Sequence, residues 1–376
     1  MKLVDFLSTF STAEAALAAL TEKYAIHVNR HGKYPNLVQL KYDQLDSPMS
    51  NELVRECRGI ILDSTDNWKV ISNPFGKFFN YDDGGAAKID WSKAKGWEKV
   101  DGSLMHLYLY DDEWQIASSG LPDASGFMDK TCTTTFAMKF WEVWSELGYA
   151  LPVMDGVFTY IFEMATAMNE VIVPQVKSRI VFIGIRNLIT GIEYDIDEFD
   201  FGWEKPARFP LTSLEHAIKE STGLNPMLNE GFVVYDGKNR IKIKSPSYVA
   251  ISHLGMTREE IVERGLNLEK YDESTQRRWM LQIILTNESD EFLAYFPQYR
   301  AMYASVKAAY ERAVKEAEAL YEAHKDLNQF LFAAKVKDHP LSGSMFIVKA
   351  GRIPDIKTAI RGMKLKNLHQ IISKKV

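Results

Sequence analysis

Cysteine is scarce in this chain of 376 residues, which contains only Cys57 and Cys132. Two cysteines cannot build a disulfide framework or a metal site made of thiolates alone. The scarcity excludes the small, disulfide-stabilised class of secreted proteins and fits the reducing cytosol. We expect both cysteines to serve as small apolar residues of the core.

Long apolar runs are also absent. The chain has no run of about 18 or more apolar residues, and residues 1–10 do not combine a basic start with an apolar core. No internal repeat or low-complexity segment is visible. With 46% hydrophobic and 25% charged residues, the composition is that of an ordinary globular protein. We therefore expect a soluble cytoplasmic protein that is long enough for two domains.

A net positive charge is missing as well, since the formal net charge is −5 at pH 7. This balance argues against a protein that coats nucleic acid through its overall charge. Residues 349–376 are nevertheless basic, with Asp355 as their single acid. Their basic residues are Lys349, Arg352, Lys357, Arg361, Lys364, Lys366, Lys374 and Lys375. This basic tail either contacts phosphates or forms the solvated face of a C-terminal helix, and both interpretations stay open.

The first two thirds of the chain are rich in short β-type runs. These runs, separated by Gly, Asp, Asn and Pro, extend over residues 37–244. A helix is predicted after Ser11, whose spacing to Glu14 is that of a capping box, and another over residues 128–147. The pattern predicts an α+β fold with mainly antiparallel sheets.

The last third has a helical pattern. Thr257 and Glu260 repeat the capping-box spacing, and apolar residues then recur at helical intervals. The recurring residues are Tyr303, Val306, Tyr310, Val314, Ala317 and Tyr321, followed by His324. Such a stripe is typical of a helix packed on a core, and we interpret His324 as a core or boundary histidine. We predict one domain over residues 1–252 and an all-helical domain over residues 253–376.

The segment Lys99-Val100-Asp101-Gly102 lies between two strand-like stretches. The pattern K-x-D-G is short, so a match by itself is a weak signal. It is either a turn beside a solvated lysine or the site of a nucleophilic lysine. Other segments of the chain have to decide between these interpretations.

A carboxylate interrupts the strongly apolar run VFTYIFEMA at Glu163. An ionised side chain that is buried in such a strand must be paired or must bind a ligand. The alternative is an edge strand on which Glu163 faces water.

Two lysines share one face of a predicted hairpin. NEGFVVYDGKNRIKIKS reads as two strands joined at Asp236-Gly237. Lys242 and Lys244 then project to one face and Ile243 to the other. The paired ammonium groups either bind an anion or lie on an exposed polar face. Arg58, just before another apolar strand, could likewise bind a phosphate or pair with an acid.

One chemistry uses these groups together. A lysine attacks only as the neutral amine, and nearby positive charge favours that form. Lys242, Lys244, Arg58 and a divalent metal ion could supply such charge, and the same cations would bind a triphosphate. Glu163 could contact a ribose or hold hydrated Mg²⁺.

The order of these segments carries a resemblance. Lys99-Val100-Asp101-Gly102, Glu163, Glu230-Gly231 and Lys242-Ile243-Lys244 resemble motifs I, III, IV and V of the covalent nucleotidyltransferases, which include DNA ligases, RNA ligases and mRNA capping enzymes. RECRGIILD, NPFGKFFN, EKVDGSL and KIKSPSYV are similar to segments of the RNA ligase 1 family of T-even-type bacteriophages, over residues 56–249. The helical last third also fits this family, because DNA ligases and capping enzymes usually continue with an OB-fold.

The resemblance implies an ATP-dependent RNA ligase with a lysyl-AMP intermediate. Its catalytic residues would be Lys99, the nucleophile, and Asp101, Lys242 and Lys244. Its nucleotide site would comprise Arg58, Phe79, Glu98, Lys99, Val100, Gly102, Glu163, Glu230, Gly231, Lys242, Lys244 and Tyr248. Glu163 and Glu230 would also hold Mg²⁺ or Mn²⁺ through water, and Val100 would offer apolar contact to the adenine.

The implied substrate is single-stranded or nicked RNA such as tRNA, repaired in the cytoplasm of a phage-infected cell by a monomer that needs no protein partner. The helical domain would help to choose the RNA. In one place the chain departs from the pattern, because residues 117–120 read Ala-Ser-Ser-Gly where a relative has a lysine. A DNA ligase, a GTP-using capping enzyme or a nucleic-acid-binding relative without catalysis are the alternatives.

Overall fold

The structure is a computed structural model that describes residues 1–129, 131–153, 156–169, 172–254, 256, 268–287 and 289–373. The chain forms two compact units, Met1–Tyr248 and Val249–Val376, and each is described by itself. The boundary after residue 248 lies inside helix α6, Pro246–Leu254, as does the boundary that we predicted after residue 252. Val249 and Leu254 are part of the apolar core of the second unit, which explains the earlier boundary.

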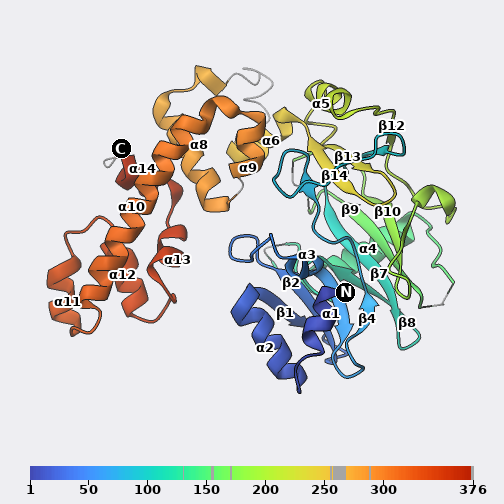
Figure 1. The fold of residues 1–376 in the computed structure, drawn as a ribbon, viewed down its shortest axis with the longest axis horizontal. Helices are drawn as coiled ribbons and strands as arrows, with labels where there is room; N and C mark the ends of the chain where they lie inside the picture. Colours follow the sequence, from blue (N-terminus) through green and yellow to red (C-terminus); the bar gives the residue numbers. More distant parts are fainter. Residues whose placement is uncertain are drawn as a thin grey trace. The chain divides into compact units, whose positions relative to one another are not determined.

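An N-terminal sheet begins the first unit (Figure 1). Its antiparallel strands, in spatial order, are β1 Ile26–Arg30, β2 Leu37–Tyr42, β3 Arg58–Asp63 and β4 Lys69–Ser72. Three helices accompany it: α1 Lys2–Leu7, α2 Ala13–Tyr24 and α3 Glu52–Glu56. Buried side chains of these helices and of one sheet face form a common core. On the opposite face Leu37, Ile61 and Ile71 pack in a small core with Tyr108 and Ala117, and the polar residues of that face remain available to line a site.

A second antiparallel sheet of five strands follows. In spatial order the strands are β11 Glu193–Tyr194, β10 Arg179–Asn187, β9 Phe158–Ala165, β7 Ser103–Tyr110 and β8 Glu113–Ser118. Helix α4, Phe136–Glu146, packs on one face, where the Trp144 ring lies 5.6 Å from the Phe162 ring and 5.4 Å from the Trp203 ring. Strand β9 is an interior strand because it pairs with β10 on one side and β7 on the other, and its buried side chains join this aromatic core.

A third sheet presents the lysine hairpin. In spatial order its strands are β12 Arg208–Phe209, β6 Lys95–Glu98, β13 Gly231–Tyr235, β14 Arg240–Lys244 and β5 Phe79–Asn80. All neighbouring strands are antiparallel except β14 and β5. Helix α5, Leu214–Thr222, contacts β13 and β14, and a 3₁₀ turn covers Ile196–Glu198. The β13–β14 hairpin turns after Asp236 as predicted, and the α+β fold with mainly antiparallel sheets is confirmed.

Three local predictions are wrong in detail. Helix α2 is capped by Thr12, whose hydroxyl accepts a hydrogen bond from the Ala15 N–H (3.2 Å), and not by Ser11. Helix α4 begins after Thr135, because the preceding Asp129 carboxylate holds a loop of threonines by accepting their hydrogen bonds. Cys57 is buried as expected, whereas Cys132 is exposed. Its φ of 55° belongs to a tight loop, where a side chain has no core to enter.

The second unit is helical over its described residues. After α6 its elements are η2 Leu268–Lys270, α8 Glu273–Thr286, α9 Ser289–Tyr295, η3 Pro297–Tyr299, α10 Arg300–His324, α11 Gln329–Val336, α12 Ser342–Lys349, α13 Ile356–Arg361 and α14 Leu365–Ser373. The predicted stripe lies on α10 and enters the core, and His324 sits at the helix end with partial exposure. The proposed cap at Thr257 and Glu260 lies outside the described residues. Among the helices that the structure describes, none combines the length and apolarity needed to cross a membrane.

Candidate active site

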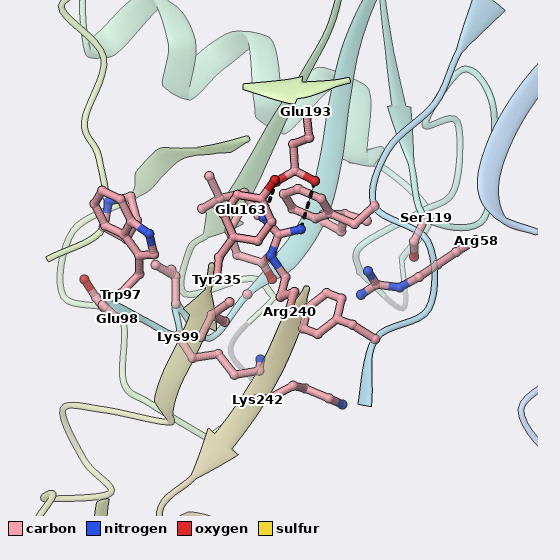
Figure 2. Close-up of a pocket in the computed structure, with 18 of the residues that line it drawn as sticks. Arg58, Trp97, Glu98, Lys99, Ser119, Glu163, Glu193, Tyr235, Arg240 and Lys242 are labelled. Atoms are coloured by element: carbon pink, nitrogen blue, oxygen red, sulfur yellow. Dashed lines mark hydrogen bonds and ion pairs between the residues drawn. The ribbon is translucent and has the colours of Figure 1, made fainter. Parts of the chain in front are cut away.

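A cavity of about 760 Å³ lies in the first unit, where the three sheets meet. Among its lining residues are eight that we predicted, namely Arg58, Glu98, Lys99, Val100, Gly102, Glu163, Lys242 and Lys244. Figure 2 shows Lys99 and Lys242 on one side of this cavity and Arg58 with Ser119 on the other. The fold therefore brings together side chains that are far apart in the sequence.

Lys99 follows directly after strand β6. Its backbone N–H donates to the Gly231 carbonyl (2.9 Å), which continues the pairing of β6 with β13. Its ammonium group donates to Glu230 Oε2 at 2.6 Å, and the side chains of Lys99 and Glu230 are 21% and 4% exposed. Lys99 therefore reaches the cavity from a rigid strand end, with a buried carboxylate beside its nitrogen.

Glu230 and Lys244 complete this buried ion-pair group. Lys244 Nζ lies 3.5 Å from Glu230 Oε1. Glu230 does not line the large cavity, but it lines a neighbouring cavity of about 140 Å³ together with Lys99 and Asp101. A single carboxylate thus holds two of the predicted lysines in place.

The second strand of the hairpin alternates as predicted. Ile241 and Ile243 are buried in the core below the sheet, while Lys242 and Lys244 line the cavity. The alternation of side chains along a strand requires this division once one face is packed. The alternative of an exposed polar face is therefore wrong.

Glu163 lies on β9, between β7 and β10, where it faces Leu104 and Val181 across the ladder. The alternative of an edge strand is therefore wrong, and the carboxyl group lines the cavity. Burial raises the pKa of Glu163 to about 7, with Lys99 opposing and Glu230 reinforcing this shift. The group is thus a partly desolvated carboxyl that changes charge near neutral pH.

This raised pKa makes a prediction for stability. The ordinary pKa of a glutamate is 4.5, so the folded chain binds the proton of the Glu163 carboxyl group more tightly than the unfolded chain does. The contribution of Glu163 to stability is therefore complete below about pH 4.5 and lost as the pH rises to about 7. Glu163→Gln has no carboxyl group that can ionise, so it should not suffer this loss. The melting temperature of the variant, relative to that of the wild type, should therefore be higher at about pH 8 than at about pH 5.

Thermal unfolding at the two pH values measures this effect. Glu22→Gln, on the exposed side of α2, is the matched control, and its difference from the wild type should not change with pH. Identical pH dependence of the wild type and Glu163→Gln would contradict the assignment of the raised pKa.

Asp101 and Tyr248 lie away from the large cavity. The Asp101 carboxylate is buried and accepts hydrogen bonds from the backbone N–H groups of Ile172 (2.9 Å) and Val173 (2.8 Å) and from the Tyr248 hydroxyl (2.8 Å). These bonds fix the backbone just after Lys99. The structure therefore supports a positioning role for both residues. For Tyr248 this differs from the direct contact with the nucleotide that we expected.

Two predicted glycines are required by close backbone approach. A Cβ at Gly102 would lie 2.4 Å from the Met164 carbonyl oxygen, and one at Gly231 would lie 2.2 Å from the Ile243 carbonyl oxygen. Gly231 also has a φ of 154°, which disfavours other residues. Gly102 lines the cavity, whereas Gly231 acts through its carbonyl bond to Lys99.

The remaining predicted residues differ in what they offer. Val100 is buried against Ala165 and Val181 and reaches the cavity wall. The Glu98 carboxylate is held by Arg179 (3.0 and 3.3 Å), so its backbone and not its charge is available to the site. Phe79 pairs with β14 but does not line the cavity.

An aromatic wall with a fixed arginine was missed. The Arg240 guanidinium pairs with Glu193 and lies over the rings of Phe75 (4.0 Å) and Tyr235 (4.4 Å) (Figure 2). Trp97 lines the same region. The signal was present, because the two-residue period that identified Lys242 and Lys244 also includes Arg240.

The polar face of the N-terminal sheet forms the other wall, and it too was missed. It contributes His27, Asn29, Lys41, Tyr42 and Asp43 to the cavity. These residues come from β1, β2 and the residue just after β2, whose sequence carries no motif, so only the tertiary structure reveals them.

The candidate metal ligands are carboxylates. No cluster of three or more His, Cys, Asp or Glu side chains suited to a metal ion occurs among the described residues. Glu163 lines the cavity, while both oxygens of Glu230 face lysines at 2.6 and 3.5 Å. This donor set fits a hydrated Mg²⁺ or Mn²⁺ that keeps most of its water and takes phosphate oxygens as further ligands.

Two known RNA ligases are similar to this chain in sequence. A bifunctional polynucleotide kinase/RNA ligase named for Autographa californica nuclear polyhedrosis virus is 27% identical, over 77% of this chain and 42% of that protein. The chain thus spans less than half of that relative. An RNA ligase of Rhodothermus phage RM378 is 25% identical, over 90% of this chain and 89% of that protein.

Among solved structures, an RNA ligase of Naegleria gruberi is 14% identical, covering 42% of this chain and 50% of that chain with a TM-score of 0.32. Residues 56–248 match the model of an RNA ligase family. The matched segment is just over half of the chain and contains all of the predicted site residues. The chain therefore belongs to this RNA ligase family.

Proposed function

We propose that the chain is an ATP-dependent RNA ligase that joins RNA 5′-phosphate and 3′-hydroxyl ends. The main observation in support is that Lys99 lies at the wall of a cavity that Arg58, Lys242 and Lys244 also line. A nucleophilic amine facing a cation-lined cavity is suited to attack on a polyphosphate. Family membership favours this reaction over DNA ligation and over GTP-dependent capping.

In the first step the Lys99 nitrogen would attack the α-phosphorus of ATP. The new N–P bond replaces the bond to the β-phosphate, so pyrophosphate leaves and AMP stays on the lysine. Attack requires the lone pair of the amine, so the 2.6 Å contact with Glu230 has to open and the ammonium has to lose a proton. Val100 and the aromatic wall would contact the base, and the three cations would offset the charge of the leaving pyrophosphate.

A divalent metal ion, Mg²⁺ or Mn²⁺, fits this step. Glu163 and Glu230 are the carboxylates that would hold it, through water in the case of Glu230. When bound, the ion would neutralise phosphate charge and polarise the α-phosphate. Glu163 itself would act as an anion there, since a nearby cation favours its ionised form.

In the next steps AMP would pass from Lys99 to the 5′-phosphate of RNA, and a 3′-hydroxyl would then displace AMP. We assign these reactions to residues 1–252 and RNA selection to the helical domain over 253–376. Single-stranded or nicked RNA is the substrate class, and tRNA cut during phage infection is the proposed biological substrate. No membrane or protein partner is needed, and a cytoplasmic monomer would suffice.

Covalent labelling tests the proposed reaction. The protein, incubated with Mg²⁺ or Mn²⁺ and α-labelled nucleotide, should take up label from ATP. It should then transfer AMP to 5′-phosphorylated RNA and seal it to a 3′-hydroxyl end. Label from GTP alone would favour a capping enzyme, sealing of nicked DNA but not of RNA would favour a DNA ligase, and absence of label from both nucleotides would favour a non-catalytic relative.

The basic tail makes a separate prediction about RNA binding. Deleting residues 349–376 would not test it, because Ile356, Ile360 and Leu368 in that segment are buried in the core of the helical unit. Substitution of exposed residues is the suitable change, and the described candidates are Arg352, Lys357, Lys364 and Lys366. Lys374 and Lys375 lie outside the described residues.

Replacing these four residues with glutamine should weaken RNA binding and its salt dependence. Each lost phosphate contact lowers the slope of log K against log salt by about 0.7 for single strands. Binding isotherms at several salt concentrations measure the slope, and melting curves check the fold. An unchanged affinity and slope would identify the tail as a solvated helix face.

A further inference from the structure

Lys41 is a cation at the centre of the N-terminal wall of the cavity. It pairs with His27 on β1 and with Arg58 on β3, so the three side chains form a row across three strands. All three line the cavity. Val38 and Leu40 on the same strand are buried in the core below, which fixes Lys41 on the cavity face.

Lys41 and Arg58 are like charges placed opposite each other. Such a pair destabilises an antiparallel ladder unless an anion lies near it. Over the part of the chain that the structure describes, no carboxylate lies within 4.0 Å of either side chain's nitrogen atoms. Arg58 instead lies 5.0 Å from the ring of Phe78 and donates weakly to the Gly76 carbonyl (3.5 Å).

The carboxylates around Lys41 and Arg58 have other partners. Asp43, the acid two residues after Lys41, accepts hydrogen bonds from His27 (3.0 Å) and from two backbone N–H groups. Glu193 at the far wall is paired with Arg240, and Glu163 is shared between the charges of Lys99 and Arg58. Lys41 and Arg58, the two permanent cations of the row, are therefore poorly compensated by the protein itself.

The segment over residues 117–120, where a relative has a lysine, packs against this same wall. Gln39 donates to the Ser118 carbonyl (2.8 Å) and Asn29 donates to the Gly120 carbonyl (2.9 Å). Ser119 lies against β3, because a Cβ at Gly59 would be 3.5 Å from the Ser119 carbonyl oxygen. The Lys41 ammonium then lies 3.6 Å from the point where a Cβ of Gly120 would be.

We propose that Lys41 and Arg58 form a phosphate-binding subsite, in which Lys41 supplies from β2 the positive charge that residues 117–120 lack. The ligand is a phosphate group with at least one free negative oxygen. It comes either from the β- and γ-phosphates of ATP or from the phosphate at an RNA end. This inference rests on the proposed function, because the same cavity would hold both molecules.

Lys41→Ala in the full chain tests the subsite. Lys69→Ala is the matched control, since it removes the same charge from an exposed position of β4 outside the cavity. If the ligand is ATP, the ATP concentration for half-maximal labelling should rise at least about tenfold in Lys41→Ala, which is the effect of losing one hydrogen bond to a charged group. Sealing of RNA that already carries AMP should then be unchanged.

If the ligand is an RNA phosphate, the pattern should be reversed. Lys41→Ala should label normally with ATP, and the RNA concentration needed for sealing of pre-adenylylated RNA should rise by about the same factor. Lys41→Arg should retain the wild-type values in both cases. Normal labelling and normal sealing in Lys41→Ala would overturn the proposal.

A relocated charge gives a second readout. Adding Ser119→Lys to Lys41→Ala returns an ammonium group to the cavity from the loop, because Ser119 lines the cavity beside Arg58 (Figure 2). The double variant should recover most of the lost affinity, whereas a merely structural role of Lys41 would leave the defect uncorrected.

Failure of the proposed function is recognisable separately. In that case the wild type itself forms no labelled lysine. Calorimetry with inorganic tripolyphosphate would still test the subsite, since binding by the wild type and about tenfold weaker binding by Lys41→Ala support it. Equal binding by both proteins would overturn it.

Discussion

Lys99→Ala should abolish the covalent uptake of AMP. Removing an attacking group from a catalytic site typically costs about 10⁴-fold or more, so labelling should fall below detection. The side chain is the amine that lies at the cavity wall and at the end of a rigid strand, beside a buried carboxylate. Gel detection of labelled protein after incubation with α-labelled ATP measures the effect.

Two controls separate the loss of the nucleophile from damage to the site. Lys93→Ala removes an exposed lysine whose ammonium group pairs with Asp90, and it should label like the wild type. Lys99→Ala should still seal pre-adenylylated RNA, because that step needs the bound RNA ends and not the amine. Persistent labelling of Lys99→Ala would show that another residue is the nucleophile.

Gly102→Ala should destabilise the first unit and disturb the site. The added Cβ would lie 2.4 Å from the Met164 carbonyl oxygen and 2.9 Å from its carbonyl carbon, so the backbones of β7 and β9 have to move apart. Overpacking of this kind costs about 1–3 kcal/mol or more in the free energy of unfolding. Glu163 is adjacent to Met164 on β9, so this movement should shift Glu163 and lower the covalent labelling of the protein as well.

Denaturant titration and the labelling assay measure the two effects. Gly84→Ala is the control, since a Cβ there would meet no atom within 4 Å and the backbone has no left-handed φ. Both variants gain one methyl group, so a difference between them reports the packing at Gly102. A Gly102→Ala protein with wild-type stability and labelling would mean that β7 and β9 are not in close contact at this point.

The local elements were largely readable from the sequence. Alternation of apolar and charged residues was enough to place Lys242 and Lys244 on one face of a strand, because strand geometry has a fixed period of two. Glu163 was readable for a related reason, since a carboxyl group in an apolar run contradicts simple burial. Helix starts were harder to predict. Serine and threonine are both common N-cap residues, and the sequence does not tell whether Ser11 or Thr12 caps α2.

The roles within the site were harder to predict. Asp101 looked catalytic from its place beside Lys99, yet its carboxylate is occupied by two backbone N–H groups and Tyr248. Glu98 was expected at the nucleotide, but Arg179, from another strand, holds its charge. Both partners are distant in the sequence, and a hydrogen bond between distant residues leaves no trace in local periodicity.

The sequence by itself determined which segments become strands, which face of each strand is charged, and the order of the lysine and carboxylate motifs. These features follow from local geometry and from the cost of burying charge. Only the tertiary structure decided that Glu230 lies under Lys99 and that Lys41 stands beside the loop at Ser119. Such contacts depend on how separate sheets meet, and that arrangement is set by the packing of whole cores and not by any short segment.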